Sequence, residues 1–568
     1  MKKLAYMQIF MYFCSRFIKL RYMKTRFSLL VALLFAGYSI AQVHIRIDNP
    51  ETWSSDALIP YIGQTVIFDS PLVVSSNASY STYIVGPRRL FTPTNQAYPR
   101  DTAAYNSVLR LNNSGAIELS DISGYHRCGE KIYNLKARVN SKNRLTWVSG
   151  SWKGNSRSDM ENANIRKMVN VDGCDDCLLV CTMNLEYYLT TDFRPGTGQG
   201  PEDAAEHTTQ RIKVSKALAQ IGADLYGFVE IQQGQGAVAE IAADLNLYVN
   251  RTISDPDKKH EYTYINDKSQ VNGTYTTAAF VYDAKKLKPI GVLQETSVAG
   301  ASIPANRHRM ICFEEIATGE RFIFSVNHFK AKRGSGASGA DADQHDGQGL
   351  FNAARTKEAQ AVIDLYKGYY SNKAIKDKDI LIMGDLNAYG KEDPIVRMIS
   401  NGMIDLHRAF HADSSYSYQF AGLAGYLDHA LVNATLFPQI KGVAAFNINS
   451  DERDSYTYES GDKTMFRCSD HDPVIVGLKL DSTLMYDPSP SMNVAEIASG
   501  EDNELIIHNA VKDGQRAFYA IYSINGTLIE RKEILENDQR EALPLSPGMY
   551  IVYLYAEGRV YQRKLIIR

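Results

Sequence analysis

The sequence predicts a central α/β domain, with a small β-rich domain before it and a β-sandwich after it. Between about residues 170 and 480, apolar strands alternate with helices. Before that region, short strands lie between clusters of Gly, Pro, Asn and Ser. The chain has 568 residues, too many for a single core. We therefore expect domains over 42–168, 169–482 and 495–568, with a linker over 483–494.

The first 41 residues predict a secretory signal peptide. They contain seven Lys and Arg and no Asp or Glu, and an apolar run over 27–41 follows the basic flank. Small residues before Gln42 offer a cleavage site. An N-terminal membrane anchor is the alternative, but the run is short for a span and no other run is long enough. We expect a secreted protein, extracellular or attached to the cell surface, without stable membrane insertion.

Removal of residues 1–41 leaves 55 Lys and Arg against 64 Asp and Glu, a net charge of −9. This balance argues against broad non-specific binding of nucleic acid through net charge. A local basic groove, or a contact through bound metal, remains compatible with it.

Six of the seven cysteines lie after residue 41: Cys128, Cys174, Cys177, Cys181, Cys312 and Cys468. An even number in an exported chain predicts at least one disulfide. The Cys174-x-x-Cys177 pair also matches half of a zinc site, but no second pair completes it. Free, buried cysteines are the third alternative.

Residues 43–165 read as short strands with alternating apolar and polar residues. This pattern predicts a small barrel or sandwich, and we favour an OB-like barrel. Aromatic residues such as Tyr83 and Trp152 suit base stacking, although packing within the domain is the more common role.

The central domain shows one strand that is apolar throughout, at 380–383, which is typical of a strand buried on both faces. Further strands are expected at 178–183, 225–229, 276–282, 322–326, 426–432 and 473–480, and helices at 207–225 and 352–368. After the Pro- and Ser-rich stretch at 487–492, runs at 517–524, 548–554 and 560–568 predict the β-sandwich tail.

Polar residues follow these apolar strands directly: Asn184 and Glu186, Glu230, Asn327 and His328, Asp385 and Asn387, Asp428, and Ser469 to Asp472. A single ending of this kind is more often an Asx turn or a helix cap. Five or six such endings in one α/β domain predict that the side chains converge on one sheet edge.

Such a set meets the needs of phosphodiester hydrolysis. A divalent cation must offset charge on the phosphate, and oxygen ligands must hold it. Glu230 is the strongest candidate ligand, and Glu186, Asp385 and Asp470 are further oxygen donors.

The remaining strand-end residues supply proton transfer and phosphate contacts. His471 can deprotonate the attacking water, with Asp428 or Asp470 orienting its ring. His328 can protonate the leaving group. The amides of Asn184, Asn327 and Asn387 can bind phosphate or orient the water.

Residues from about 175 to 482 resemble the endonuclease/exonuclease/phosphatase superfamily, whose fold is a four-layer α/β-sandwich. The matching segments occur in the family's order: 183–186, 229–232, 327–330, 384–387, 427–429 and 469–473. The resemblance implies metal or phosphate binding and hydrolysis by Asn184, Glu230, Asp385, Asn387, Asp470 and His471. It implies that Asp428 assists the histidine and that His328 is the acid. Glu186 departs from the pattern, because many members carry another residue there.

Two further stretches resemble the secreted-nuclease branch, which often carries an OB-like domain before the catalytic one. They are 327–330 with 346–352 and Arg355 after it, and 446–452. Asn327, Lys330 and Arg355 are the candidate substrate contacts. The tail resembles the sorting domain of type IX secretion, through Gly526, 548–550 and 564–568.

The resemblance implies a secreted, monomeric nuclease that uses Mg²⁺, Mn²⁺ or Ca²⁺ and hydrolyses DNA, or RNA, with little sequence preference. The tail would engage the secretion machinery. One alternative is a phosphodiesterase or phosphatase acting on a lipid or small phosphate ester. Another is an inactive binding protein, against which the complete set of strand-end residues argues. Basic residues near the site favour a polyanion: Lys330, Lys332, Arg333 and Arg355.

Overall fold

The computed structural model describes residues 42–266, 276–298, 304–372, 375, 377–480, 496–499, 504–508, 517–523, 528–534, 538–556 and 559–567. The predicted signal peptide and the predicted linker at 483–494 lie outside these residues. Within the described part of the chain, no helix combines the length and apolar character that crossing a membrane requires.

The N-terminal domain is a small closed β-barrel. Its strands are β1 (Val43–Ile45), β2 (Thr65–Phe68), β3 (Leu72–Ser76), β4 (Tyr83–Gly86), β5 (Ile117–Ser120), β6 (Lys131–Ser141) and β7 (Arg144–Lys153). A ring runs through β3, β4, β5, β7 and β6, and β6 closes it by pairing with both β7 and β3. Alternation along β6 buries Leu135, Ala137 and Val139 in the barrel core. The ring confirms the predicted β-rich, OB-like domain.

Tyr83 and Trp152 take the packing role, the more common alternative to base stacking. Tyr83 is fully buried in the core. Trp152 stacks on His126 at a centroid distance of 3.6 Å and on Trp147 at 5.4 Å. These rings therefore pack within the domain, because the faces of Trp152 already have partners.

The central domain contains two six-stranded sheets. The first has the order β10 (Tyr262–Tyr264), β11 (Thr276–Asp283), β9 (Leu225–Gln232), β8 (Leu178–Tyr188), β21 (Val474–Leu478), β20 (Ile440–Ala445). The second has the order β12 (Leu287–Glu295), β13 (His308–Glu315), β14 (Arg321–His328), β15 (Ile380–Asp385), β19 (Asp428–Val432), β16 (Ile404–Asp405). A separate hairpin consists of β17 (Tyr418–Phe420) and β18 (Leu423–Gly425).

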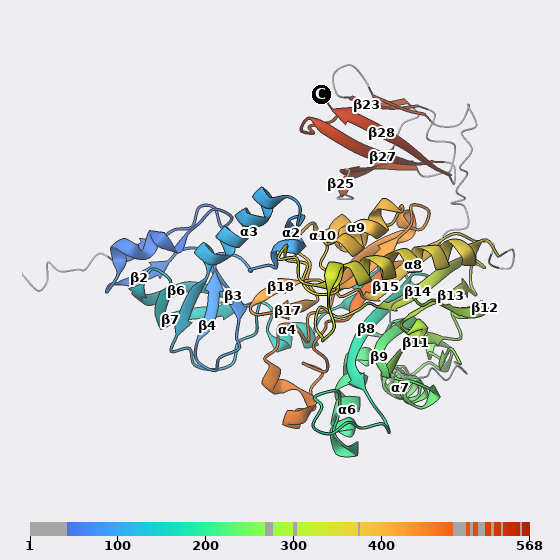
Figure 1. Ribbon diagram of the computed structural model, residues 1–568, viewed down its shortest axis with the longest axis horizontal. Helices are drawn as coiled ribbons and strands as arrows, with labels where there is room; N and C mark the ends of the chain where they lie inside the picture. Colours follow the sequence, from blue (N-terminus) through green and yellow to red (C-terminus); the bar gives the residue numbers. More distant parts are fainter. Residues whose placement is uncertain are drawn as a thin grey trace, which may run out of the picture.

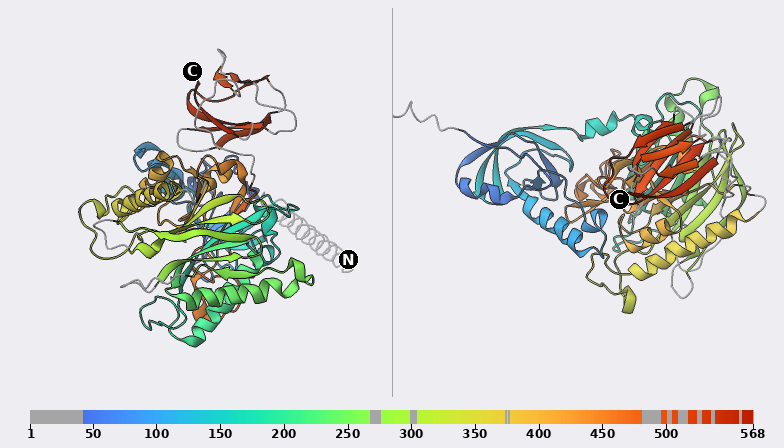
Figure 2. Two further views of the ribbon diagram at one scale, coloured as in Figure 1. Left: turned by 90° about the vertical axis from the view of Figure 1, so that its right-hand side faces the viewer. Right: turned by 90° about the horizontal axis from the view of Figure 1, so that it is seen from above.

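Helices cover the outer face of each sheet, so the domain has four layers (Figures 1 and 2). On the first sheet lie α6 (Ala204–Ile221) and α7 (Gln235–Tyr248), and on the second lie α8 (Asn352–Tyr370) and α9 (Asp393–Ser400). The inner faces pack against each other through an apolar core. Gly227 permits this approach, because a Cβ there would lie 2.4 Å from Val326 Cγ2. The four-layer sandwich predicted from the resemblance is confirmed.

Among the other described helices, α3 (Thr102–Gly115) is long, and the rest are short: α2 (Pro93–Gln96), α4 (Arg157–Glu161), α5 (Ile165–Met168) and α10 (Leu406–His411). The 3-10 segments are η1 (Ser55–Tyr61), η2 (Val249–Thr252), η3 (Pro256–Lys258), η4 (Ala305–Arg307), η5 (Gly339–Asp341), η6 (Phe437–Gln439), η7 (Asp454–Tyr456) and η8 (Tyr458–Ser460). The helix predicted over 207–225 is shifted: α6 begins at an Asp203 cap and ends before Gly222, whose left-handed backbone (φ 59°) terminates it.

The C-terminal part forms two sheets: β22 (Glu496–Ser499), β23 (Glu504–His508) and β26 (Asp538–Ala542); and β25 (Leu528–Ile534), β24 (Ala517–Ser523), β27 (Gly548–Ala556) and β28 (Arg559–Ile567). Apolar residues of both sheets share one core, which confirms the predicted β-sandwich. Tyr522 of β24 packs against Phe437 of the central domain, with ring centroids 5.4 Å apart. Gly526, part of the predicted sorting signature, lies outside the described residues.

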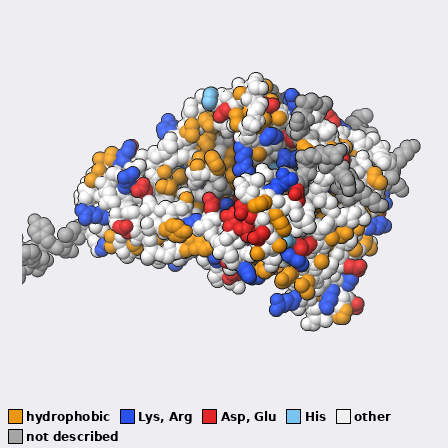
Figure 3. Space-filling view, turned by 60° about the horizontal axis from the view of Figure 1, so that its bottom comes forward, with side chains coloured by type: hydrophobic (Ala, Val, Ile, Leu, Met, Phe, Trp, Pro, Cys, Tyr) orange, Lys and Arg blue, Asp and Glu red, His pale blue; other side chains and the backbone are white. Residues whose placement is uncertain are grey.

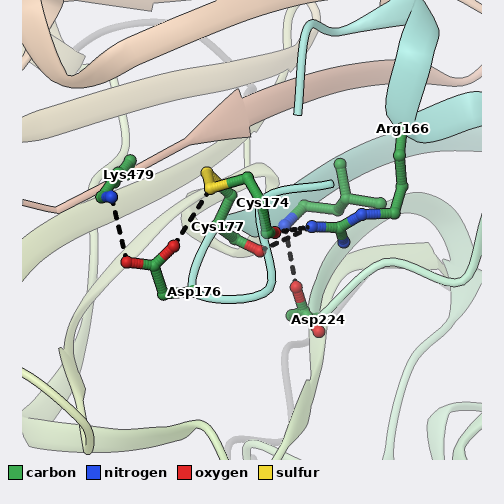
Figure 4. Close-up of a disulfide and its surroundings, with 7 residues drawn as sticks. Arg166, Cys174, Asp176, Cys177, Asp224 and Lys479 are labelled. Carbon is green, nitrogen blue, oxygen red and sulfur yellow. Dashed lines mark hydrogen bonds and ion pairs between the residues drawn. A yellow bond between two sulfur atoms is a disulfide. The ribbon is translucent and has the colours of Figure 1, made fainter. Parts of the chain in front are cut away.

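A disulfide joins Cys174 and Cys177 just before β8 (Figure 4). It confirms that the chain contains at least one disulfide, and it takes the place of the alternative zinc half-site. Arg166 donates to the carbonyl oxygens of both cysteines and so ties this turn to α5. The other four cysteines after residue 41 are buried and free: Cys128, Cys181, Cys312 and Cys468.

Candidate active site

The register of the second sheet places three of the predicted residues side by side. His328 pairs with Asp385 across the parallel β14–β15 ladder. Asp385 pairs with Asp428 across the antiparallel β15–β19 ladder. The ends of β14 and β15 and the start of β19 therefore meet at one edge. Gly384, at φ 120°, allows the close approach of β14, since a Cβ there would lie 2.2 Å from the Asn327 carbonyl oxygen.

The first sheet brings its own strand ends to the same place. β8 and β9 run parallel, and Asn184 pairs with Val229 in their register, one residue before Glu230. The Asn184 amide donates to Asp385 Oδ2 over 3.2 Å and so joins the two sheets. β21 runs antiparallel to β8 and begins beside Thr182, near the end of β8. The segment before β21, Asp470 to Asp472, therefore lies at the same edge.

His471 forms a hydrogen-bonded pair with Asp428. Its Nδ1 lies 2.8 Å from Asp428 Oδ2, which also accepts from the Ser417 hydroxyl over 2.7 Å. The ring of Tyr418 stacks on the imidazole at 4.6 Å. Burial lowers the pKa of His471, but Asp428, Asp385 and Asp470 together raise it well above its ordinary value. His471 is thus oriented through Nδ1, and its Nε2 points toward Asp385, 3.8 Å away.

Asp385 is the centre of the site. Its Oδ1 accepts from the Asn387 backbone over 2.8 Å, and its Oδ2 accepts from the Asn387 amide over 3.1 Å. The Nε2 atoms of His328 and His471 lie 3.7 and 3.8 Å from the same Oδ2. Burial raises the pKa of Asp385 to about 7, although His471 opposes this shift. Asp385, Asp428 and His471 offer ligand atoms within 4.8 Å of one another. Asp428 of this group already accepts hydrogen bonds from His471 and Ser417.

His328 lies between Asp385 and Glu230. Its Nε2 is 3.4 Å from Glu230 Oε1. Burial lowers the pKa of His328 well below its ordinary value, and the positive charges of Arg307 and His471 add to this effect. Both effects favour the neutral imidazole.

Three carboxylates crowd together on the first-sheet side of the site. Burial and the charge of Asp470 raise the pKa of Glu186 to about 8, and Glu230 adds to the shift. The same two causes raise the pKa of Glu230. Glu186 Oε2 is buried and has no hydrogen-bond partner among the described residues. Crowded, partly unsatisfied carboxylates together with the Asn184 amide form a donor set that fits a hard divalent cation.

Strained backbone accompanies this site. Glu186 (φ 49°), Tyr187 (φ 58°), Glu230 (φ 57°) and Asn387 (φ 46°) all adopt the left-handed conformation. L-residues rarely adopt it, and such strain persists only where the surrounding structure holds it in place. At Asn387 the Asp385 carboxylate provides that hold, because it accepts from the Asn387 backbone and amide.

The structure does not bring Asn327 and Arg355 to the site, and we correct their predicted substrate contacts. Strand alternation turns Asn327 away from the His328 side, and its amide donates to Ser325 Oγ and the Met383 carbonyl. Arg355 is fully buried and donates to the carbonyl oxygens of Lys330, Gln348 and Leu350. Both residues support the fold around the site.

Lys332 forms an ion pair with the buried Glu392, so its charge is already balanced within the protein. Lys330 is half-buried over the Phe351 ring, at 4.3 Å, and donates to the Arg333 carbonyl. Burial and nearby Arg307 lower the pKa of Lys330, and the charge of Lys330 in turn helps to lower the pKa of His328. The basic surface predicted there is therefore smaller than the sequence suggested.

Three residues near the site were missed by sequence reasoning: Arg307, Tyr418 and Arg467. Arg307 directly precedes β13. Because β13 runs antiparallel to β14 and His308 pairs with Asn327, Arg307 lies at the same edge as His328. Its position just before an apolar strand could have identified it from the sequence. Burial lowers the pKa of Arg467, but the negative charges of Glu186 and Asp470 raise it overall, so the guanidinium lies close to these carboxylates. Tyr418 follows no apolar strand, so no pattern distinguished it from neighbouring tyrosines.

No family model matches the sequence, and no curated protein matches it. Solved structures similar to the chain include an endonuclease/exonuclease/phosphatase family protein from Bacteroides thetaiotaomicron (16% identity, TM-score 0.37, 54% of this chain and 96% of that one). Others are a mannosyl-6-phosphatase from the same species (15%, 0.34, 53% and 98%) and the human Nocturnin catalytic domain with bound sulfate (11%, 0.34, 53% and 94%). Identity and TM-score are low throughout, so we base the functional assignment on the site residues.

Proposed function

We propose that the chain is a divalent-metal-dependent phosphodiesterase of the endonuclease/exonuclease/phosphatase superfamily, and that it acts as a secreted nuclease on DNA. One observation carries this proposal. Both sheets deliver their strand ends to Asp385, where an oriented histidine–aspartate pair, a second histidine and a cluster of carboxylates meet. This combination suits attack of water on a phosphate ester.

Glu230, Asp470, Glu186 and the amide oxygen of Asn184 would hold the cation, Mg²⁺, Mn²⁺ or Ca²⁺. When bound, such an ion would offset the negative charge that develops on the phosphate oxygens. Burial is the main cause of the raised pKa values of Glu186 and Glu230, and the negative charge of Asp470 adds to it; a bound cation would offset both effects.

His471 is the proposed general base. Asp428 holds its Nδ1, which leaves Nε2 to accept a proton from water, and the aspartate stabilises the imidazolium that results. Ser417 fixes the aspartate in turn. His328 is the proposed acid at the leaving oxygen. Because burial and nearby positive charges lower its pKa, this role requires the negative charge of a bound phosphate to raise it.

Contacts with substrate phosphates are proposed for Arg307, Lys330 and Arg467. On the face shown in Figure 3, acidic side chains gather near the middle and basic side chains lie around them, without one continuous basic surface. Such a surface suits local contacts with backbone phosphates, which position a nucleic acid without reading its sequence. We therefore propose that DNA is cut with little sequence preference.

A lipid or small phosphate ester is the second candidate substrate. The β17–β18 hairpin beside His471 carries Phe420 at its turn, 67% exposed. A single exposed ring is a small membrane contact, whereas it suits stacking on one nucleobase. This favours the nucleic acid.

Secretion belongs to the same proposal. We propose that residues 1–41 direct export and that the C-terminal β-sandwich routes the protein through the type IX machinery. The site residues all lie within 184–471, so the sandwich adds none of them.

The test measures whether the full mature protein hydrolyses plasmid DNA, single-stranded DNA, RNA, sphingomyelin and bis-p-nitrophenyl phosphate. Each substrate is assayed with Mg²⁺, Mn²⁺, Ca²⁺ or chelator, across a salt series. We expect metal-dependent DNA cleavage that weakens as salt rises, because each basic contact releases counterions. Turnover of the lipid without DNA cleavage would favour the second candidate, and no turnover of any ester would contradict the phosphodiesterase.

A further inference from the structure

The barrel and the α/β domain exchange segments with each other. Residues 446–453, between β20 and β21, form hydrogen bonds with the N-terminal domain, and we call this segment the docking loop. In return, residues 88–98, between β4 and α3, insert into the α/β domain, where Thr94 and Asn95 are fully buried. Thr94 donates to Glu392, and the Asn95 side chain accepts from the Tyr426 backbone.

Asp451 of the docking loop is held from the barrel side by several donors at once. Arg89 donates to its Oδ1 over 2.8 Å, and Asn155 donates to its Oδ2 over 2.7 Å. Its backbone carbonyl accepts from the Cys128 backbone and the Asn77 amide. Asp451 is fully buried, so these bonds are made away from water.

Glu452 repeats the pattern one residue later. Arg127 and Arg157 both donate to its carboxylate, and Tyr125 donates to Oε2 over 2.7 Å. Arg127 and Glu452 are both almost fully buried. The docking loop therefore presents two adjacent carboxylates to three arginines of the N-terminal part of the chain.

The other side of the docking loop holds the residue next to His471. Asp472 accepts from the Asn449 backbone over 2.7 Å, from the Ser450 backbone over 3.0 Å and from the Asn447 amide over 2.9 Å. The Asn449 amide also donates to the carbonyl of His471 itself over 2.6 Å. The backbone that carries the proposed base is thus fastened to a loop that the barrel grips.

The hairpin above His471 is fastened to the barrel as well. Arg89, which holds Asp451, also donates to Gln419 of β17 over 2.6 Å. The backbone of residues 90–92 exchanges two hydrogen bonds with Ala424 of β18. This hairpin supplies Tyr418, stacked on the imidazole, and is preceded by Ser417, bonded to Asp428.

We propose that the barrel is a positioning device for the His471–Asp428 pair, in which Arg89 and Asp451 lock the docking loop and the hairpin into one arrangement. The inference rests on the proposed function of this site. If the barrel positions the pair, disturbing its contacts should lower kcat. If the barrel instead bound nucleic acid as a separate module, disturbing it should raise KM.

The test compares Asp451→Asn with a matched control, Asp244→Asn. Asp244 is also a buried carboxylate held by an arginine, but it lies on α7, pairs with Arg211 of α6, and touches none of the positioning contacts. Both variants are assayed in the full mature chain, at a temperature where circular dichroism shows each to be folded. Hydrogen exchange with mass spectrometry is measured on the same samples.

We expect Asp451→Asn to lower kcat by about 10²-fold with little change in KM, because a small misplacement of a catalytic group costs that much. Asp244→Asn should retain kcat. Exchange should increase over 414–428 and 446–473 in Asp451→Asn only. Equal kcat in the two variants, or a raised KM with unchanged kcat, would overturn the inference. Unchanged exchange over 414–428 and 468–473 would also overturn it, and that readout is independent of whether the site hydrolyses phosphodiesters.

Discussion

Asp428→Asn is the most direct test of the proposed base. The carboxylate accepts from His471 Nδ1 and from Ser417 Oγ, at 2.8 and 2.7 Å. An asparagine amide would donate to Nδ1, which favours the imidazole tautomer that carries its proton on Nε2. That nitrogen then has no lone pair with which to accept a proton from water. The side-chain shape is retained, so the change acts on proton transfer and not on packing.

A positioned general base contributes about 10²–10⁴-fold to the rate. At ~1.36 kcal/mol for each tenfold, the loss corresponds to about 3–5 kcal/mol of transition-state stabilisation. We expect kcat to fall by this factor while KM changes little, because no contact with the substrate is removed. The measurement is initial-rate kinetics on plasmid DNA and bis-p-nitrophenyl phosphate with saturating metal.

The same change affects stability in a defined pH range. Asp428 is one of the carboxylates that raise the pKa of His471 well above its unfolded value of about 6.5. The stability from this pair is present in full below pH 6.5 and disappears as pH rises through the folded pKa. Asp428→Asn should therefore lower Tm more at pH 6 than at alkaline pH.

Asp224→Asn is the matched control for Asp428→Asn. Asp224 is an equally buried aspartate, but it lies at the start of β9, at the opposite end from Glu230, and pairs with Lys286. It should cost stability and leave kcat unchanged. If Asp428→Asn retained kcat within a few-fold of the wild type, His471 would not be the base and the assignment would be wrong.

Three further outcomes are expected. Glu230→Gln should nearly abolish hydrolysis and weaken metal binding in calorimetry, and near wild-type turnover would refute its role as a ligand. The rate should rise with pH on its acid side, because His471 must lose its proton to act as base; a rate that is flat or falls from pH 5 to 8 would contradict this. A chain ending at residue 484 should cleave DNA normally in vitro yet remain in the cell, and unchanged secretion would remove the sorting role of the tail.

The convergence of the site could be predicted because it follows from local rules. Apolar runs identified β8, β9, β14 and β15, and a polar residue at the end of each parallel strand must lie at the same edge. Antiparallel neighbours begin where those strands end, which accounts for the residues before β21 and at the start of β19. No long-range contact had to be guessed for this step.

The errors arose where strand alternation or loop folding decided the outcome. Asn327 and His328 are adjacent, so only one of them can face the site, and sequence reasoning assigned a role to both. Arg355 lies on α8, and the fold of the preceding loop over 330–350 decides whether its guanidinium meets phosphate or carbonyl oxygens. That loop has no periodic pattern from which its path could be inferred.

The domain boundary at 168 divides the sequence, but the buried contacts of the docking loop cross it. Asp451 and Glu452 are separated from Arg89 and Arg127 by more than 320 positions in the sequence, and no local pattern reveals which charges meet. Buried ion pairs of this kind contribute less to stability than apolar residues of the same volume, because both partners lose hydration. They do, however, penalise every arrangement in which a charge is left unpaired. A set of such pairs therefore selects one placement of the barrel on the α/β domain, which is the property that a support for His471 requires.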